Sequence, residues 1–388
     1  MMRRFLVAVI FSVFAVTALS TSSEAFLLGD ETKGAKFDLG GEKDLKVRIR
    51  LQPRLDIGDL EINEAGTAYE SESDFYFRRI RLEFYGHMTK KLTYALILRG
   101  DHWGETGMTD KIKLYQAYVN YKFADAFNLH FGRKKLPYSR VSLTSSSKQL
   151  ILTRPRSTEA AKGVFKDYYQ FMAMAHGGFA DGVVRYALAV ADGFVNGDTV
   201  MGGNKVQKAS PVYVARVELS LPGWVEKKKK DSHLGKGRHL TLGASYGVQN
   251  GIEYQGSNSE EDRTLFNVDL SGHLGGLTGQ IEYIEWTIDS SAAAIAETKP
   301  KGWYGQVGYF ITGPDIEPVV RYEQYDQDSN SSDMTEKILT VGLNWYPKGH
   351  SAKVGVNWVQ TEFERNASGW LANDDKKSEV QIMGQIYY

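Results

Sequence analysis

Three arginines stand within four positions of an apolar stretch of the chain. Residues 75–86 read FYFRRIRLEFYG, so Arg78, Arg79 and Arg81 adjoin aromatic and aliphatic side chains. Each guanidinium presents a planar fork of N–H donors that matches the oxygens of phosphate or carboxylate. Arginines at this spacing could therefore bind anions, provided that the fold places them in water and not in a packed core.

The stretch alternates with a period of two, which is the pattern of a β-strand with one apolar face. Arg79 and Arg81 share one parity, and Ile80 and Leu82 share the other. An arginine that faces the middle of a bilayer costs about 2–4 kcal/mol, so we expect Arg79 and Arg81 to face an aqueous interior. Arg78 has the outward parity, and we expect its side chain to reach the lipid head groups.

The preceding strand adds further arginines to the same wall. Residues 44–57 alternate in the same way, so we expect Arg48, Arg50 and Arg54 to point inward. We expect the available acids, locally Glu83, to be too few to neutralise this column. In a water-filled lumen such a column creates a positive potential that concentrates anions. The alternative is that these arginines brace the wall through ion pairs with acids elsewhere in the barrel or on an inserted loop.

The composition favours an exported, strand-rich protein. The chain has 388 residues, with 47 Lys+Arg against 47 Asp+Glu, 22 Tyr, 39 Gly, 9 Pro and no Cys. The balanced charge gives no reason to expect a nucleic-acid partner, and the lack of cysteine excludes disulfides and thiolate metal sites. Residues 1–25 combine a basic start, an apolar middle and small residues before Ala25. This predicts a secretory signal peptide that is cleaved after Ala25.

About sixteen strand-like runs of roughly 10 to 14 residues follow. Tight turns such as FADG (179–182) alternate with long polar loops such as 58–73, and the chain ends on the aromatic residue Tyr388. Short turns at one end and long loops at the other are typical of outer-membrane barrels. We therefore predict an all-β fold in the outer membrane of a Gram-negative bacterium. It is a 16-stranded antiparallel transmembrane β-barrel over residues 44–388, preceded by a short periplasmic segment over residues 26–43.

Four stretches resemble the phosphate-selective porin O and P family. They are FYFRRIRLEFYG (75–86), YALILRGD (94–101), YQAYVNYKF (115–123) and LHFGRKKLPYS (129–139), and the likeness covers roughly residues 44–165. The resemblance implies a sixteen-stranded trimeric barrel that passes phosphate, polyphosphate or other small anions. It places Arg79 and Arg81 in an arginine track, and it places Lys135 at the constriction.

The longest loop carries a strong positive balance. Residues 139–163 read SRVSLTSSSKQLILTRPRSTEAAKG, with five basic side chains against the single acid Glu159. A run of hydroxyl groups, residues 144–147, offers donors that suit an oxyanion. In porins the corresponding loop, loop 3, folds inward and narrows the channel, and we expect the same here.

Two other connections have unusual charge. Residues 221–238 should form a short turn but contain four consecutive lysines, Lys227–Lys230, and we expect a solvated periplasmic excursion. Loop 58–73 is acidic, and we expect it to pack against lipopolysaccharide through bridging divalent cations. Acidic outer loops would disfavour the entry of anions, which weighs against strong selectivity.

The sequence thus predicts an outer-membrane porin for passive diffusion of small anions, with phosphate or polyphosphate as candidates. The alternative is a general non-selective diffusion porin, and a barrel enzyme or an adhesin fits less well. The eight histidines are scattered, with no pair at ligand spacing on one face, so we expect no catalytic site, metal or cofactor. The expected partners are small inorganic anions, outer-membrane lipid and lipopolysaccharide, and further copies in a homotrimer. The candidates for lining the pore and binding anions are Arg48, Arg50, Arg54, Arg79, Arg81, Lys135, Lys148, Arg154 and Arg156.

Overall fold

The computed structural model describes residues 34–200, 203–256, 259–291 and 297–388. The predicted signal peptide, residues 1–25, lies outside the described residues. None of the helices within these ranges is long and apolar enough to cross a membrane.

The described chain forms one antiparallel sheet of 18 strands, two of them very short. The barrel strands are β2 (Asp44–Ile62), β3 (Tyr69–His87), β4 (Leu92–Trp103), β5 (Lys113–Ala124), β6 (Phe127–Lys135), β7 (Tyr169–Phe179), β8 (Val184–Ala191), β10 (Val212–Ser220), β11 (Arg238–Tyr254), β12 (Glu260–Leu274), β13 (Leu277–Ser290), β14 (Lys301–Tyr309), β15 (Ile316–Asp326), β16 (Thr335–His350), β17 (Ala352–Phe363) and β18 (Lys376–Tyr387). The short strands are β1 (Ala35–Asp38) and β9 (Val206–Lys208). The helical turns are α3 (Arg140–Leu143), η1 (Ser146–Lys148), α4 (Arg156–Ala160), η2 (Ala161–Gly163) and η3 (Ala180–Gly182).

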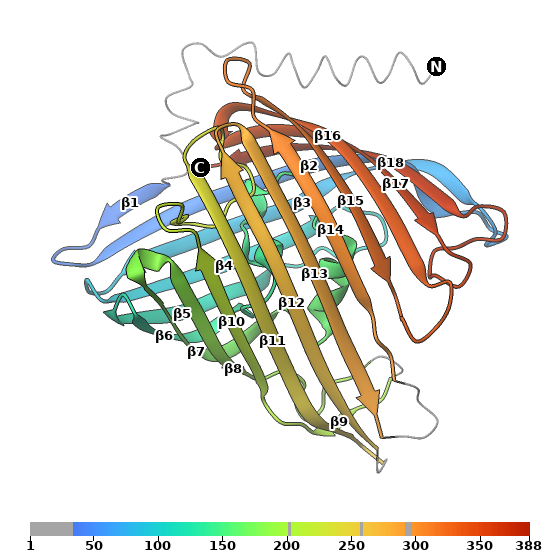
Figure 1. Cartoon of the computed structure of the whole chain (residues 1–388), viewed down its shortest axis with the longest axis horizontal. Coiled ribbons are helices and arrows are strands. Elements are labelled where there is room, and N and C mark those ends of the chain that lie inside the picture. Colours follow the sequence, from blue (N-terminus) through green and yellow to red (C-terminus); the bar gives the residue numbers. More distant parts are fainter. Residues whose placement is uncertain (1–33, 201–202, 257–258, 292–296) are drawn as a thin grey trace.

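The sheet closes on itself, because the last strand, β18, pairs with β2 (Figure 1). Successive strands pair around the ring, and β8 pairs directly with β10. With β1 and β9 set aside, sixteen strands make up the closed barrel, as predicted. Closure leaves these strands without a free edge, so their backbone groups are paired within the sheet.

The two faces of the barrel differ in the way that the sequence alternation predicts. Along β10, Tyr213 and Val217 are 51% and 46% exposed, whereas Arg216 and Glu218 are buried. The exposed side chains of the barrel strands are largely apolar and suit lipid, and many of the buried ones are polar or charged. The interior therefore has many polar side chains, and it also holds an apolar cluster in which Tyr138 and Phe165 pack with inward side chains such as Val214 of β10.

A β-bulge overturns the expectation for Arg78. The register passes from Gln52 opposite Arg79 to Pro53 opposite Phe77, so Arg78 is the extra residue on β3. An extra residue breaks the two-residue alternation, and beyond it the inward side chain is Tyr76, which is buried. Arg78 contacts Nε2 of His102 and lines an interior cavity. The prediction that Arg78 reaches the lipid head groups is wrong.

The connections alternate between short turns and longer loops, as predicted. The end of the barrel that carries residues 88–91 and 275–276 is called the short-turn end below, and the other the long-loop end.

The predicted loop 58–73 is wrong in its extent. β2 runs on to Ile62 and β3 begins at Tyr69, so only residues 63–68 form the turn. The charged residues of this stretch can stay in strand pairing because they extend beyond the apolar band.

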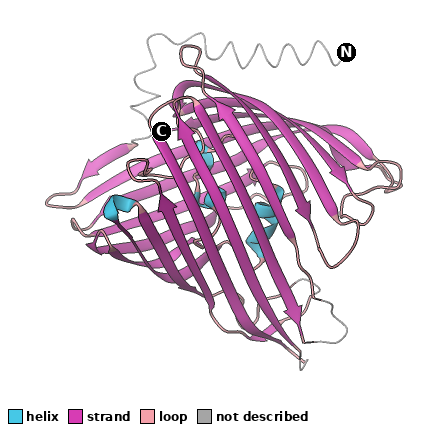
Figure 2. Cartoon of the chain, viewed as in Figure 1, coloured by secondary structure: helices cyan, strands magenta, loops and turns pink. Residues whose placement is uncertain are grey.

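The connection between β6 and β7, residues 136–168, is called the inner segment. Buried side chains and backbone groups of this segment contact strands on several sides of the ring, including β2, β13 and β17. These contacts involve the inward side chains of the strands, so the segment crosses the interior. Figure 2 shows its helical turns in cyan within the ring of strands.

The connection between β10 and β11, residues 221–237, is called the short-end segment. It was expected to be a solvated excursion, which holds for the exposed Lys227 and Lys228 but is wrong for the residues on either side of them. Asp231 and Ser232 are 3% and 0% exposed, and the backbone N–H groups of both donate to the carbonyl of Lys148 in the inner segment. The short-end segment therefore folds back and docks on the inner segment. Buried Glu226 of the short-end segment also forms an ion pair with Arg140 of the inner segment.

Candidate anion pathway

The inner segment is held by hydrogen bonds to inward side chains of many barrel strands. Wall side chains of β2, β13, β15, β16, β17 and β18 form hydrogen bonds with the segment, and Arg263 of β12 also donates to the carbonyl of Val164 at 2.9 Å. The pairs are Arg50 with Ser146 Oγ, Glu282 with Thr158 Oγ1, Arg321 with Thr153 O, Asn344 with Leu150 O, Lys353 with Gln149 O and Gln385 with Ser147 O, at distances of 2.7–3.2 Å. Most of these contacts are made to backbone carbonyls of the segment. Cavities remain against β3–β5, which include Arg79 and Arg81 of β3, and against β6–β8.

The first cavity, of about 290 Å³, lies between the inner segment and strands β3, β4 and β5. Eight basic side chains line it against three carboxylates. The basic residues are Arg78, Arg79, Arg81, Arg99, Lys111, Lys113, Arg154 and Lys162, and the acids are Asp101, Glu159 and Asp167. We call this the basic cavity. Its surplus of positive charge, inside walls of low dielectric, attracts anions.

Two arginines face each other directly on the wall of the basic cavity. Arg81 on β3 is opposite Arg99 on β4 in the strand register, and Asp101 is beside both. Arg81 Nη2 donates to Asp101 at 2.7 Å, and Arg99 lies 3.8 Å from the same carboxylate. Both guanidinium groups also stack on the ring of Tyr115, at 4.0 and 4.9 Å. One carboxylate thus serves two cations, and the pair keeps a net positive charge.

Arg79 has no carboxylate partner within the part of the chain that the structure describes. It is 3% exposed, and its Nη1 donates to the amide oxygen of Gln52 at 3.1 Å. Among the ion pairs of the residues that the structure describes, none includes Arg79 or Arg78. Because a buried guanidinium carries several donors that require oxygens, Arg79 is the most direct candidate for contact with an anion.

The inner segment supplies the opposite side of the cavity. Arg154 donates to the carbonyl oxygens of Val141 and Thr144, both at 3.2 Å, which fixes its guanidinium in place. Lys162 contacts Glu159. Burial lowers the pKa of Lys162 to about 8, although the negative charge of Glu159 acts to raise it. Burial disfavours the charge on Glu159, but Lys162 and Arg154 outweigh it and lower the pKa of that carboxyl to about 2.

Arg54 belongs to a different cavity, which lies at the long-loop end. Six acids and three basic residues line this cavity of about 570 Å³, which we call the acidic vestibule. Arg54 Nε donates to Asp56 at 2.6 Å, and Tyr76 donates to the same carboxylate at 2.9 Å. The charge of Arg54 is therefore neutralised locally. Arg78 lines both cavities and lies at their boundary.

The other predicted residues mainly hold the inner segment in place. Arg50 donates to Glu83 at 2.6 Å and to Ser146 at 2.9 Å, and Arg48 donates to the hydroxyl of Tyr387 at 3.0 Å. Lys135 donates to the carbonyls of Ser142 and Thr144. Arg156 donates to Glu336 at 3.1 Å. Burial lowers the pKa of Lys148 to about 8, with repulsion from Lys230 and Lys228 adding to it.

The five wall arginines therefore do not form one continuous column, and the nine predicted residues do not share one cavity. Arg79, Arg81 and Arg154 share the basic cavity, and the others lie elsewhere. The expectation that local acids are too few is wrong for three of the five wall arginines, which pair with Glu83, Asp56 and Asp101. Glu83 and Asp56 share the inward parity of these arginines, and Asp101 lies on the neighbouring strand β4. The pairing of the strands therefore brings each acid next to an arginine.

Some residues of the basic cavity were missed. Arg99 has the parity of the buried Ala95 and Ile97, so the two-residue alternation of residues 94–101 could have placed it inward. Lys111 lies before β5 and Lys113 is its first residue, so no alternation predicts where their side chains point. The expectation that the histidines are scattered is also wrong for three of them. His239 lies opposite His273 in the register, and His233 of the short-end segment stacks on His273.

Known proteins resemble this chain in sequence and in fold. The family model described as phosphate-selective porin O and P matches residues 47–388. A protein of Aquifex aeolicus (strain VF5) that bears the name "Uncharacterized protein" is 38% identical over 391 residues, which cover 92% of this chain and 89% of that protein. An anion-selective porin from Comamonas acidovorans has a TM-score of 0.64 at 12% identity, covering 89% of this chain and 100% of that one. The trimer form of OmpT, an outer-membrane protein of Vibrio cholerae, has a TM-score of 0.59 at 10% identity, covering 90% and 100%.

Proposed function

Because this chain belongs to the phosphate-selective porin O and P family, an outer-membrane porin family, we propose that it prefers small anions and that oxyanions such as phosphate bind in its lumen. Passive diffusion through the barrel is the activity of the family. The preference for anions, and for phosphate among them, is the proposed part. The chain would act as a channel and not as an enzyme.

The observation that carries the proposal is the basic cavity. Its eight basic side chains outnumber its three carboxylates, and Arg79 has no carboxylate partner among the described residues. Arg79, Arg81 and Arg99 come from neighbouring strands, and Arg154 faces them from the inner segment. A tetrahedral oxyanion accepts hydrogen bonds from several directions, so guanidinium groups on both sides of the cavity suit phosphate better than a single-sided site.

Block of chloride current by phosphate tests this proposal. In planar bilayers of the purified protein, millimolar phosphate should reduce the chloride current of the wild type. Arg79→Gln should abolish most of this block, whereas Arg79→Lys keeps the charge and should retain part of it. Lys301→Gln removes one exposed charge from β14, outside the basic cavity, and is the matched control. Equal block in wild type and Arg79→Gln would contradict the role of the cavity.

A non-selective diffusion porin is the second candidate, and the acidic vestibule favours it. Six acids line the long-loop end against three basic residues, so an anion that enters there first meets negative potential. Salt screens charges over about 8 Å at physiological ionic strength, which limits this barrier in a wide entrance. A reversal potential near zero in a salt gradient would favour the non-selective pore.

We propose a homotrimer because the strands on one side of the barrel, β6 and β8, are short. β8 has 8 residues, fewer than the about 9–11 that a transmembrane strand usually needs, and β6, with 9, is at the lower limit. Phe131 and Leu188 on these strands are 68% and 53% exposed. A partner subunit would cover this low apolar side, and contact with outer-membrane lipid and lipopolysaccharide is proposed for the taller side. Chemical cross-linking in intact outer membranes should yield trimers, and a monomer alone would contradict this arrangement.

A further inference from the structure

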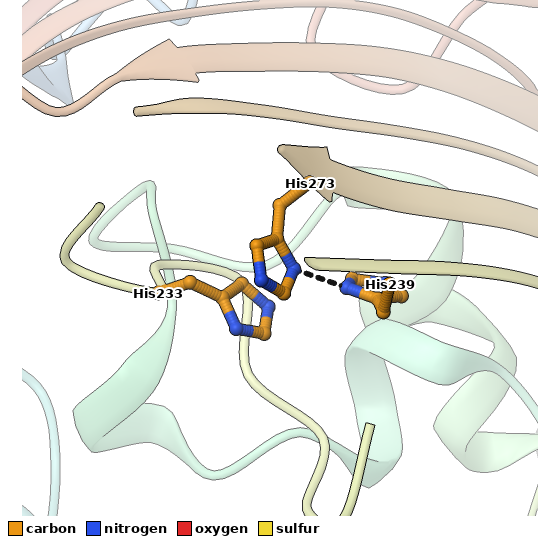
Figure 3. A group of neighbouring side chains, drawn as sticks. All are labelled: His233, His239 and His273. Carbon is orange, nitrogen blue, oxygen red and sulfur yellow. Dashed lines mark hydrogen bonds between the residues drawn. The ribbon is translucent and has the colours of Figure 1, made fainter. Parts of the chain in front are cut away.

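Three histidines meet at the short-turn end of the barrel (Figure 3). His239 is the second residue of β11 and lies opposite His273 near the end of β12. His233 comes from the short-end segment, and its ring lies 3.4 Å from that of His273, centroid to centroid. Nitrogen atoms of the three rings all lie within 4.8 Å of one another. The two strand histidines are 1% and 6% exposed, so the cluster is shielded from bulk solvent.

The hydrogen bonds of the three rings leave the same nitrogen available on each. Nε2 of His233 contacts the carbonyl of Lys230 at 3.0 Å, and Nε2 of His273 contacts the carbonyl of Lys236 at 3.0 Å. A carbonyl only accepts, so both Nε2 atoms carry the hydrogen and Nδ1 of each neutral ring has its lone pair free. Nε2 of His239 lies 3.1 Å from the hydroxyl of Ser271, which can accept in the same way.

This is the arrangement that protein metal sites use. A histidine that binds a metal through one nitrogen usually donates the other N–H to a carbonyl, carboxylate or water, which fixes the tautomer and the ring orientation. Nδ1 of His239 and Nδ1 of His273 point at each other within hydrogen-bond reach. Two lone pairs this close repel each other, so either one ring is protonated or the two rings move apart around a bound cation.

We propose that His233, His239 and His273 bind a divalent transition-metal ion, with a further position open to water. This site goes beyond the proposed passage of anions. Three imidazoles and an open position suit Zn²⁺, Cu²⁺ or Ni²⁺, whereas Mg²⁺ and Ca²⁺ require a set of oxygen ligands. Glu226 Oε2 lies 3.9 Å from His233 Nε2 and adds negative charge nearby, although Arg140 takes part of it.

The ion would fasten the short-end segment to the barrel wall. Two ligands lie on adjacent strands and the third on the connection that folds back into the lumen. Zn–N distances of about 2.0–2.1 Å place tetrahedral ligand nitrogens about 3.4 Å apart. The ring of His233 must therefore move closer, and the Nδ1 atoms of His239 and His273 must move apart. Side-chain rotation on the two strands and the position of His233 on a connecting segment allow this without any change in strand pairing.

Zinc binding by the untagged, chelator-washed full-length protein tests the site. Calorimetric titration with Zn²⁺ in detergent should give a stoichiometry of about one per chain. His233→Gln leaves both strands untouched and should weaken binding at least about 100-fold, as should His273→Gln. His87→Gln is the matched control, because exposed His87 lies 2.9 Å from Asp44 and could bind zinc adventitiously. Heat-dependent mobility in gel electrophoresis verifies that each variant has folded.

A second measurement reports on the segment itself. In chains whose exposed Lys227 and Lys228 are replaced by Gln, bound Zn²⁺ should slow cleavage after Lys229 and Lys230 by a lysine-specific protease, and it should have no effect once His233→Gln is added. Loss of binding in the two cluster variants and not in His87→Gln would support the site. Absence of binding in the wild type, or binding that His233→Gln and His273→Gln leave unchanged, would overturn it. In that case the three rings serve only to pack the short-end segment against the wall.

Discussion

The ion pair between Arg140 and Glu226 should control whether the short-end segment stays docked. The pair joins α3 of the inner segment to the short-end segment, and the two side chains are 2% and 4% exposed. Arg140 Nη2 also donates to the carbonyl of Lys230 at 3.0 Å. Removal of one partner from a buried pair costs about 3–5 kcal/mol, because the other charge remains buried and uncompensated. With about 1.4 kcal/mol per factor of ten, Arg140→Gln should raise the undocked fraction by about 100-fold or more.

Proteolysis measures that fraction in chains that carry Lys227→Gln and Lys228→Gln, because these two lysines are exposed in the docked state, whereas Lys229 and Lys230 are half-buried and Lys229 contacts Glu218. A lysine-specific protease should cut Arg140→Gln after Lys229 and Lys230 about 100 times faster than the same chain with Arg140, if opening is fast relative to cleavage. The double variant Arg140→Gln/Glu226→Gln should be cut more slowly than Arg140→Gln, since no unpaired charge remains. Arg133→Gln is the control, because the pair of Arg133 with Asp167 is 22% and 39% exposed and costs about 0–1 kcal/mol. Equal rates for Arg140→Gln and Arg133→Gln would refute this account of docking.

Three further results are expected. Between pH 7 and pH 9 the permeability ratio of anions to cations should fall. Burial lowers the pKa of Lys148 and of Lys162 to about 8, so both side chains lose positive charge in this window. A ratio that is constant with pH would speak against their contribution. Glu159→Gln removes one of the three carboxylates of the basic cavity and should shift the reversal potential further to the anion side, whereas a shift to the cation side would contradict the charge balance given above. N-terminal sequencing of the protein from outer membranes should begin at Phe26, and a chain that retains residues 1–25 would disprove the signal peptide.

Much of the barrel could be predicted from the sequence, because alternation and turn spacing are local properties. The parity of Arg79, Arg81 and Glu83 was correct, and all three are buried in the lumen. Arg78 was placed wrongly because a bulge on β3 interrupts the alternation, and a single sequence carries no periodic signal for one extra residue.

The interior was harder to predict, because it depends on contacts between distant parts of the chain. The run Lys227–Lys230 has the composition of a solvated loop, yet Lys229 contacts Glu218 at 2.8 Å and the segment docks inside. The pairing of His239 with His273 follows from the register of β11 and β12 over a separation of 34 residues. Spacing along the sequence gives no indication of such a pair, so the histidine cluster required the structure.

Reversal potential under a KCl gradient tests the central claim most directly, namely that the basic cavity makes the pore prefer anions. In planar bilayers the wild type should reverse on the anion side. Arg79→Gln should move the reversal potential toward zero, and Arg79→Lys and Lys301→Gln should leave it close to that of the wild type. A wild-type reversal potential at zero or on the cation side would contradict the account, and the arginines of β2 and β3 would then act as braces of the wall.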